Sequence, residues 1–308
     1  MPAQTIKGFT VERPAALAGI RTIDTHSHLN YHGYNVHDAV RNMDALGIER
    51  AWLFTWEAPY DEYGVGDHRF MSPHQVGIPF DVVVQAIELY PDRFVPGWAI
   101  DPRRPQAIDR LRHAVEVFGV RVYGEMKLRM MYDDLDLIEM YRVCGELGLP
   151  VHFHLELELP NPGGTEVGGG PRPYWFGGEF DVVERFLAKC PETNFIGHAP
   201  GFWREISGDA ELREMYPKGP VLPGGRLHGV LDRFPNLYCD MGAGSGLNAL
   251  SRDPEHAKSF IERYQDRIVF GRDYWDDAHL QFLATLGLDR AVLTKILSGN
   301  ALRLVPLA

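Results

Sequence analysis

Residues 20 to 28 read Ile20-Arg21-Thr22-Ile23-Asp24-Thr25-His26-Ser27-His28, an apolar run that ends on two histidines two positions apart. Alternate side chains of a β-strand point to opposite faces, so His26 and His28 are expected on the same face. Two imidazoles on one face can hold one metal ion, such as zinc, iron, nickel or manganese. The alternative is a polar exit from the strand that has no ligand role.

Metal-binding residue types recur at the ends of three later strand-like runs. Pro150-Val151-His152-Phe153-His154 carries a second alternating histidine pair, Asn194 to His198 ends on a histidine, and Ile268 to Asp273 ends on a carboxylate. In a barrel of alternating strands and helices, the strand ends converge on the face that holds the active site. The sequence therefore predicts that these side chains gather at one site.

Short β-rich runs alternate with helical patterns through almost the whole sequence, which is typical of a parallel sheet with crossover helices. Eight such runs predict an α/β fold, a TIM or (βα)8 barrel, in a single domain spanning residues 1–308. An open doubly wound sheet is the alternative, but no GxGxxG follows its first strand. The expected strands lie near 20–25, 50–56, 94–100, 120–127, 150–155, 194–198, 236–241 and 268–273, and the expected helices include Val36 to Leu46, Phe80 to Tyr90, Gln106 to Phe118, Leu135 to Leu147, Phe180 to Lys189 and Pro254 to Tyr264.

Composition narrows the class of protein and its partners. The 308 residues carry a formal net charge of -11, which argues against nucleic acid because phosphate binding needs clustered Lys and Arg. No apolar stretch is long enough for a signal peptide or a membrane span. Three widely spaced cysteines imply neither a disulfide framework nor a CxxC site, so a cytoplasmic location is expected. The expected partner is a small-molecule substrate, and a homo-oligomer remains open.

Two long loops follow strands that end on histidine, one over Leu159 to Phe176 and one over Ala199 to Gly225. Their glycines are compatible with a phosphate cradle, but the Lys-Ser/Thr ending of a P-loop is missing. A mobile lid or a plain long loop is the favoured interpretation, and either would stand over the site.

Five ordered motifs resemble the amidohydrolase superfamily, in particular its amidohydrolase-2 (amidohydrolase-related) family of metal-dependent hydrolases and decarboxylases. These are Asp24 to His28, Pro150 to His154, Gly197-His198, Phe270 to Tyr274 and Ser298 to Leu304, which together span nearly the whole chain. The resemblance implies a distorted (βα)8 barrel with metal at the carboxyl ends of its strands.

Carried over position by position, the resemblance implies the roles of individual residues. His26 and His28 match the ligands of the first strand, and His154 matches the ligand of the fifth. His198 matches a sixth-strand histidine that binds a second metal or contacts the reacting group. Asp273 matches an eighth-strand aspartate that serves as ligand and proton acceptor. His152 shares the face of His154 but lies deeper, where it would orient a ligand rather than be one.

The fourth strand, Gly124-Glu125-Met126-Lys127, offers two candidates for the ligand that bridges two metals in part of the superfamily. Glu125 resembles the Gly-Glu of TatD-like hydrolases and is the preferred bridging ligand. Lys127 is the alternative, either as a carbamate or as a cation that binds a substrate carboxylate. An ion pair of Glu125 with Lys127 or Arg129 is the structural interpretation.

The resemblance implies one or two divalent ions, with zinc preferred and manganese, iron or nickel as alternatives. A metal held by His26, His28, His154 and Asp273 would activate water at neutral pH, with Asp273 as proton acceptor and the metal or His198 polarising a carbonyl. Nearby cations would fix a substrate carboxylate or form structural salt bridges instead. These cations are Lys127, Arg172, Arg204 and Arg272.

Three functions fit these features. The leading hypothesis is a hydrolase acting on an amide, lactone or similar small carbonyl compound. The alternative is a nonoxidative decarboxylase of an aromatic or unsaturated acid, which a single metal and an arginine-lined pocket would favour. A barrel that keeps metal only for structure or sensing is the third, and the complete set of matching His and Asp residues argues against it.

Overall fold

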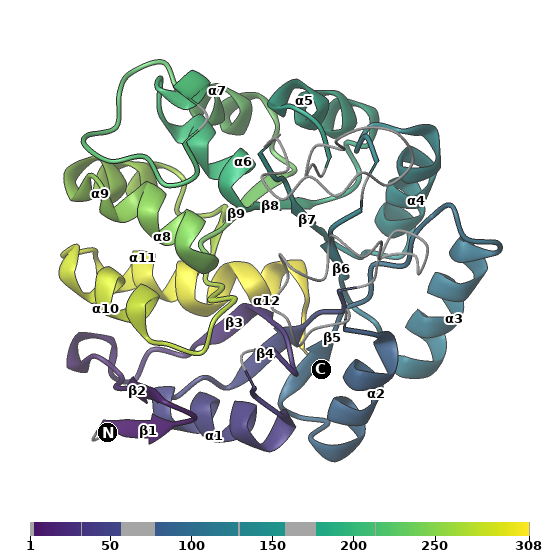
Figure 1. Ribbon diagram of the computed structural model, residues 1–308, viewed down its shortest axis with the longest axis horizontal. Coiled ribbons are helices and arrows are strands. Elements are labelled where there is room, and N and C mark those ends of the chain that lie inside the picture. The colour runs from purple at the N-terminus through teal and green to yellow at the C-terminus, as the bar shows by residue number, and fades with distance from the viewer. Residues whose placement is uncertain are drawn as a thin grey trace, which may run out of the picture.

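Parallel strands form the centre of the molecule and alternate with helices along the chain (Figure 1). The computed structural model describes residues 3–31, 33–56, 78–128, 130–157, 177–212 and 214–307. The central strands of these ranges are β3 (Ile23–Ser27), β4 (Arg50–Leu53), β5 (Phe94–Pro96), β6 (Tyr123–Met126), β7 (Val151–His154), β8 (Phe195–His198), β9 (Leu237–Asp240) and β10 (Ile268–Val269). They form a three-stranded sheet, β3-β4-β5, and a five-stranded sheet, β10-β9-β8-β7-β6.

Backbone hydrogen bonds join the two sheets at both edges. Gly97 and Val122 form a parallel bridge beyond β5, where the Trp98 N–H donates to the Val122 carbonyl at 3.0 Å. At the other edge, the Thr25 N–H donates to the Phe270 carbonyl at 2.8 Å. The strands thus follow one another around a ring, as the sequence predicts for a (βα)8 barrel.

Helices surround this ring of strands (Figure 1). The described ones are α1 (Val36–Leu46), α2 (Phe80–Leu89), α3 (Ala107–Phe118), α4 (Leu135–Glu146), α5 (Phe180–Lys189), α6 (Pro200–Trp203), α7 (Arg226–Arg233), α8 (Ala243–Ser251), α9 (Pro254–Arg263), α10 (Ala278–Thr285), α11 (Arg290–Thr294) and α12 (Asn300–Leu304), with a π-helical turn at Lys295–Gly299. Local signals set their ends. The Asn35 side chain accepts the Asp38 N–H at the start of α1, and Gly47 ends that helix at a φ of 63°.

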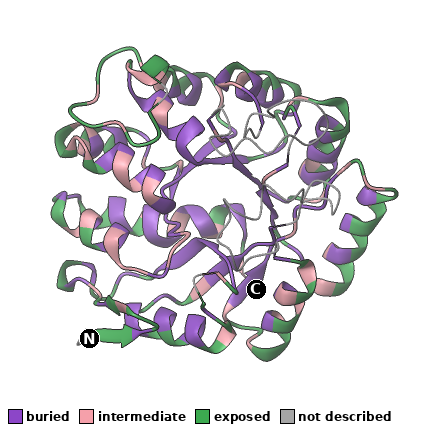
Figure 2. Cartoon of the chain, viewed as in Figure 1, coloured by how far each residue is buried: buried purple, intermediate pink, exposed green. Residues whose placement is uncertain are grey.

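Apolar side chains fill the space between strands and helices and also close one end of the barrel. Figure 2 shows buried residues concentrated on the strands and on the helix faces turned toward them. A second apolar cluster lies inside the ring, where Ile23 and Val122 pack with Leu304 and Val305 of the C-terminal segment. This cluster plugs the barrel where the strands begin, which leaves the other end of the barrel for polar side chains.

Some elements differ from the expectations. A short antiparallel hairpin, β1 (Gln4–Ile6) with β2 (Phe9–Val11), precedes the barrel and was not predicted. The predicted loop from Ala199 to Gly225 contains α6 and two short 3-10 turns, Arg204–Ile206 and Ala210–Leu212. The loop from Leu159 to Phe176 lies outside the described residues. Among the helices that the structure describes, none combines the length and apolar character needed to cross a membrane.

Candidate metal centre

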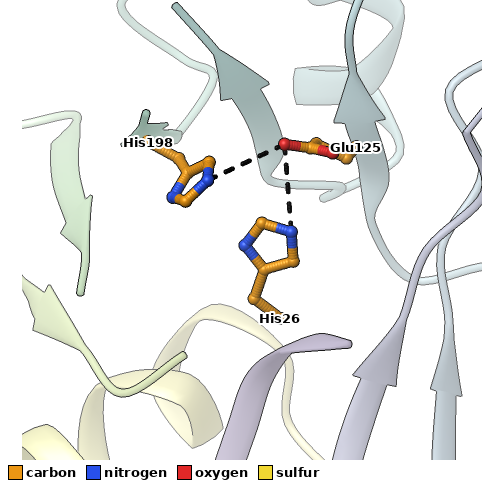
Figure 3. A group of neighbouring side chains, drawn as sticks. All are labelled: His26, Glu125 and His198. Carbon is orange, nitrogen blue, oxygen red and sulfur yellow. Dashed lines mark ion pairs between the residues drawn. The ribbon is translucent and has the colours of Figure 1, made fainter. Parts of the chain in front are cut away.

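Three strands bring His26, Glu125 and His198 together at the end of the barrel opposite the apolar plug. Figure 3 shows these side chains facing one another from β3, β6 and β8. Glu125 Oε1 lies 3.8 Å from His26 Nε2 and 4.0 Å from His198 Nε2. All three residues are buried, so their charges face one another with little screening by water.

His28 and Asp273 complete the cluster. His28 Nε2 lies 3.1 Å from His26 Nε2 and 3.3 Å from Glu125 Oε2. Asp273 Oδ1 lies 3.5 Å from His26 Nε2 and 3.6 Å from His28 Nε2, while its Oδ2 lies 3.7 Å from His198 Nε2. The structure therefore brings five of the six predicted ligands into one cluster, His26, His28, Glu125, His198 and Asp273.

The backbone of Asp273 is fixed in an uncommon conformation. Its φ is 60°, in the left-handed region that non-glycine residues rarely adopt. Its N–H donates to the His26 carbonyl at 3.0 Å, which ties the end of β10 to the first strand of the barrel. Such a conformation persists where the surrounding structure enforces it, and here it turns the carboxylate toward the histidines.

The spacing of these atoms fits a divalent metal ion. Tetrahedral zinc with bonds of about 2.0 to 2.1 Å places its ligand atoms roughly 3.3 Å apart. Three overlapping groups of described residues have ligand atoms within 4.8 Å of one another: one of His26, His28 and Asp273, one of His26, Glu125 and His198, and one of His26, His152 and Asp240. Imidazole and carboxylate together suit zinc, manganese, iron or nickel.

Buried charges shift the pKa values of the cluster. Burial lowers the pKa of His26, but the charges of Asp273, Asp240 and Glu125 outweigh it and raise that pKa to about 10. Burial would raise the pKa of Glu125, yet the positive charges of Lys127 and a neighbouring histidine hold it well below its usual range. The pKa of Asp273 is likewise lowered, against its burial, by the histidines. Ionised carboxylates therefore surround a protonated His26 in the absence of metal.

His154, the sixth predicted ligand, is placed between two carboxylates. Its Nδ1 lies 2.9 Å from Glu125 Oε1, and its Nε2 lies 3.1 Å from Glu156 Oε2. It is thus adjacent to Glu125 without belonging to any of the three groups. A ligand role for His154 remains a prediction. Glu156 was not predicted, although its position two residues after His154 on the same side of the chain is a usable signal.

Asp240 is the central residue that the sequence analysis missed. This fully buried side chain at the end of β9 places Oδ2 2.7 Å from His26 Nδ1 and 3.1 Å from His198 Nδ1. The same oxygen lies 3.1 Å from His152 Nε2, so His152 contacts a carboxylate and its supporting role stays a prediction. The signal was present, because a strand ending on a carboxylate at 240 repeats the pattern that ends at Asp273.

The four predicted cations lie in different surroundings. Lys127 Nζ lies 3.8 Å from the centre of the Trp56 ring, close enough to the cluster to lower the pKa of Glu125. Arg204 Nη2 lies 2.7 Å from Glu179, which pairs it with a carboxylate of the chain. Arg272 is fully buried and bonded to Asp24 at 2.7 Å. Arg172 lies outside the described residues.

Aromatic rings extend from the cluster at His28. The Trp56 ring stacks on His28 with centroids 5.8 Å apart, and Tyr31 meets His28 edge-on at 6.0 Å. Tyr274 stacks on Tyr31 with centroids 6.0 Å apart. Burial and the charge of Asp273 raise the pKa of Tyr31 and raise that of Tyr274 to about 12, so both phenols are neutral at physiological pH.

Comparisons with known proteins agree with this arrangement. The amidohydrolase family model matches residues 23–307, and a search of curated proteins found no match. The 5-carboxyvanillate decarboxylase of Sphingomonas paucimobilis is 14% identical, with a TM-score of 0.60 over 94% of this chain and 100% of that one. A probable 2-pyrone-4,6-dicarboxylic acid hydrolase of Acinetobacter baumannii is 13% identical, with a TM-score of 0.59 over 92% and 98%. An amidohydrolase of Burkholderia multivorans with bound zinc is 14% identical, with a TM-score of 0.59 over 94% and 100%. At these identities the likeness shows a shared fold.

Proposed function

Because the chain belongs to the amidohydrolase family, we propose that it is a metal-dependent hydrolase acting on an amide, lactone or similar small carbonyl compound. One observation carries the proposal. The Nε2 atoms of His26 and His28 lie 3.1 Å apart, and each lies 3.3 to 3.8 Å from carboxylate oxygens of Glu125 and Asp273. Such a donor set suits a divalent cation better than it suits any structural role.

A divalent cation held by these residues would lower the pKa of a water molecule to about 7 and polarise a carbonyl group. Zinc is the preferred ion, and the zinc named for the Burkholderia multivorans structure supports this choice. Manganese, iron and nickel are the alternatives.

Asp273 and His198 would have different roles, one in proton transfer and the other as a metal ligand. Asp273 would accept the proton of the attacking water and return it to the leaving group, because its carboxylate faces the histidine cluster from the strand end. His198 would serve as a ligand rather than a hydrogen-bond donor to substrate. Its Nδ1 lies 3.1 Å from Asp240 Oδ2 and burial lowers its pKa, which favours a neutral ring with Nε2 free to bind metal.

The position of Glu125 favours two ions and hydrolysis over decarboxylation. Its Oε2 lies 3.3 Å from His28, while its Oε1 faces His154 at 2.9 Å and His198 at 4.0 Å. Its Oε1 also lies 3.8 Å from His26 Nε2, so both oxygens face histidines, which supports a bridging role. We propose that Glu125 joins an ion held by His26, His28 and Asp273 to an ion held by His154 and His198.

The cations near the site are the candidates for contacts with the substrate. Lys127 is close enough to Glu125 to lower its pKa, and we propose that Lys127 binds an anionic group of the substrate. Arg204 and Arg172 are further candidates, although the pairing of Arg204 with Glu179 favours Lys127. A decarboxylase remains the second candidate, since one of the structural neighbours carries that name.

The three cysteines, Cys144, Cys190 and Cys239, are buried and free, which supports the proposal of a cytoplasmic, reducing environment. We also propose that the chain forms a single barrel domain, because the family model matches residues 23–307.

Activity on a panel of amides and lactones, measured with zinc-loaded protein, tests the function. Asp273→Asn should keep bound metal and lose turnover by about 10²-fold or more, since the proton acceptor is removed. Asp277→Asn, which changes an aspartate that bonds Glu12 and Gln281 outside the site, is the matched control and should keep turnover. Turnover retained in Asp273→Asn would contradict the proposed role.

A further inference from the structure

Asp240 contacts histidines from three different strands through a single oxygen atom. Its Oδ2 lies 2.7 Å from His26 Nδ1 on β3, 3.1 Å from His198 Nδ1 on β8 and 3.1 Å from His152 Nε2 on β7. All four side chains are buried at the level of the strand ends. No other described carboxylate reaches both His26 and His198 through their inner nitrogens.

The carboxylate of Asp240 is itself held in place. The Gly242 N–H donates to its Oδ1 at 3.0 Å, and the Trp203 indole N–H donates to its carbonyl oxygen at 2.8 Å. A Cβ atom on Gly271 would lie only 2.0 Å from Oδ1, so the glycine at 271 leaves the space that the carboxylate occupies. Asp240 is therefore a fixed acceptor rather than a side chain that adapts to its neighbours.

A fixed carboxylate can accept only from an imidazole nitrogen that carries a proton. The neutral ring then has its proton on Nδ1 and its lone pair on Nε2, the form that binds metal. His26 Nε2 and His198 Nε2 both face Glu125, one at 3.8 Å and the other at 4.0 Å. One oxygen atom thus sets the orientation of two rings whose Nε2 atoms face the same Glu125 oxygen, Oε1.

We propose that Asp240 is a positioning residue that selects the Nδ1–H form of His26 and His198 together and so prepares both rings to bind metal beside Glu125. The inference rests on the metal centre of the proposed function. It does not depend on whether the substrate is hydrolysed or decarboxylated, because its readouts are metal affinity and the position of ring protons.

The test titrates metal-free wild type and Asp240→Asn with Zn²⁺ against a chelator of known affinity. The amide introduced at position 240 would present a donor to one or both rings, so zinc affinity should fall by about 10 to 100-fold. ¹H–¹⁵N correlations of the histidine rings in the zinc-loaded wild type should show the proton on Nδ1 of both His26 and His198. In Asp240→Asn, that proton should leave Nδ1 in at least one of them.

His152→Gln is the matched control, because it removes a partner of the same oxygen that has no place among the proposed ligands. Its zinc affinity should stay within about threefold of wild type, since both ligand rings keep their acceptor. Should Asp240→Asn fail to fold, Gly242→Ala replaces it, because a Cβ there would lie 2.8 Å from Asp240 Oδ2 and displace the carboxylate with its charge intact. A folded variant of either kind with affinity within twofold of wild type and unchanged ring protons would overturn the inference.

Discussion

Asp24 and Arg272 form a fully buried ion pair, with Arg272 Nε 2.7 Å from Asp24 Oδ2. The pair joins the first strand of the barrel to the residue that precedes Asp273. Arg272 Nη1 also donates to Asn42 Oδ1 at 2.9 Å, which adds α1 to the same network. The guanidinium thus has a structural role, in agreement with the salt-bridge alternative stated from the sequence.

Breaking this pair should destabilise the protein strongly. Asp24→Ala leaves the Arg272 charge buried without its carboxylate, and such losses lower the free energy of unfolding by about 3 to 5 kcal/mol. Urea unfolding followed by circular dichroism measures the change. The control is Asp181→Ala, which breaks an exposed pair with Arg185 and should cost at most about 1 kcal/mol. Equal losses in the two variants would show that the buried pair contributes no more to the free energy of unfolding than the exposed pair does.

Metal binding should release protons. Burial lowers the pKa of His26, but Asp273 and Asp240 outweigh it and raise that pKa to about 10, so His26 is protonated at pH 8 when no metal is bound. An incoming cation must displace that proton, and affinity should therefore fall as pH is lowered. Calorimetric titration with Zn²⁺ in two buffers of different ionisation enthalpy should give about one proton released at pH 8. A heat of binding independent of the buffer would contradict the expectation.

Asp253 should make stability depend on pH in the acid range. Its side chain accepts the N–H of His256 at the start of α9 and the N–H of Val221, and these bonds lower its pKa in the folded protein. A folded pKa below the unfolded one gives stability that is present above the unfolded value near 4 and is lost as pH falls through the folded value. Asp253→Asn keeps a cap without the charge, so its unfolding free energy should fall less steeply below pH 4 than that of wild type. Parallel pH profiles of the two proteins would count against this assignment.

Replacing Lys127 should weaken the binding of anionic substrates more than the binding of neutral ones. A hydrogen bond to a charged group contributes about 1.5 to 3 kcal/mol, so Lys127→Met should raise KM for a carboxylate-bearing lactone by about 10-fold or more. KM for the neutral analogue should change by less than about twofold. Lys258→Met, which alters an exposed helix lysine near Glu262, is the control and should leave both values unchanged. Equal changes for the two substrates would assign Lys127 to the structure of the site instead.

Much of the fold could be predicted from hydrophobic patterns and turn residues. All eight expected strands correspond to β3 through β10, and α1 has the predicted bounds, because Asn35 and Gly47 mark its ends. The first strand begins at Ile23 rather than Ile20, since the Arg13 guanidinium donates a hydrogen bond to the Ile20 carbonyl at 2.7 Å. Such a contact between a side chain and the backbone leaves no trace in the periodicity of apolar residues.

Site residues that end a strand could be predicted from the sequence. Residues whose role depends on the side chains around them were harder to predict. His26, His28, His198 and Asp273 lie where the strand ends converge, as expected. Asp240 and Glu156 were missed, although the strand-end position of Asp240 and the spacing of Glu156 from His154 were signals, because contacts with neighbouring histidines give them their function. Spacing alone cannot tell a ligand from the residue that orients it.

The number of metal ions per chain is the measurement that decides whether Glu125 bridges two ions. Elemental analysis of wild type and Glu125→Ala, both grown without added metal, counts the ions per chain. We expect two equivalents in wild type, falling toward one in the variant, because both oxygens of Glu125 face histidines, Oε2 facing His28 and Oε1 facing His26, His154 and His198. One equivalent in both proteins would contradict the bridged centre, make Glu125 structural or substrate-facing, and place decarboxylation ahead of hydrolysis.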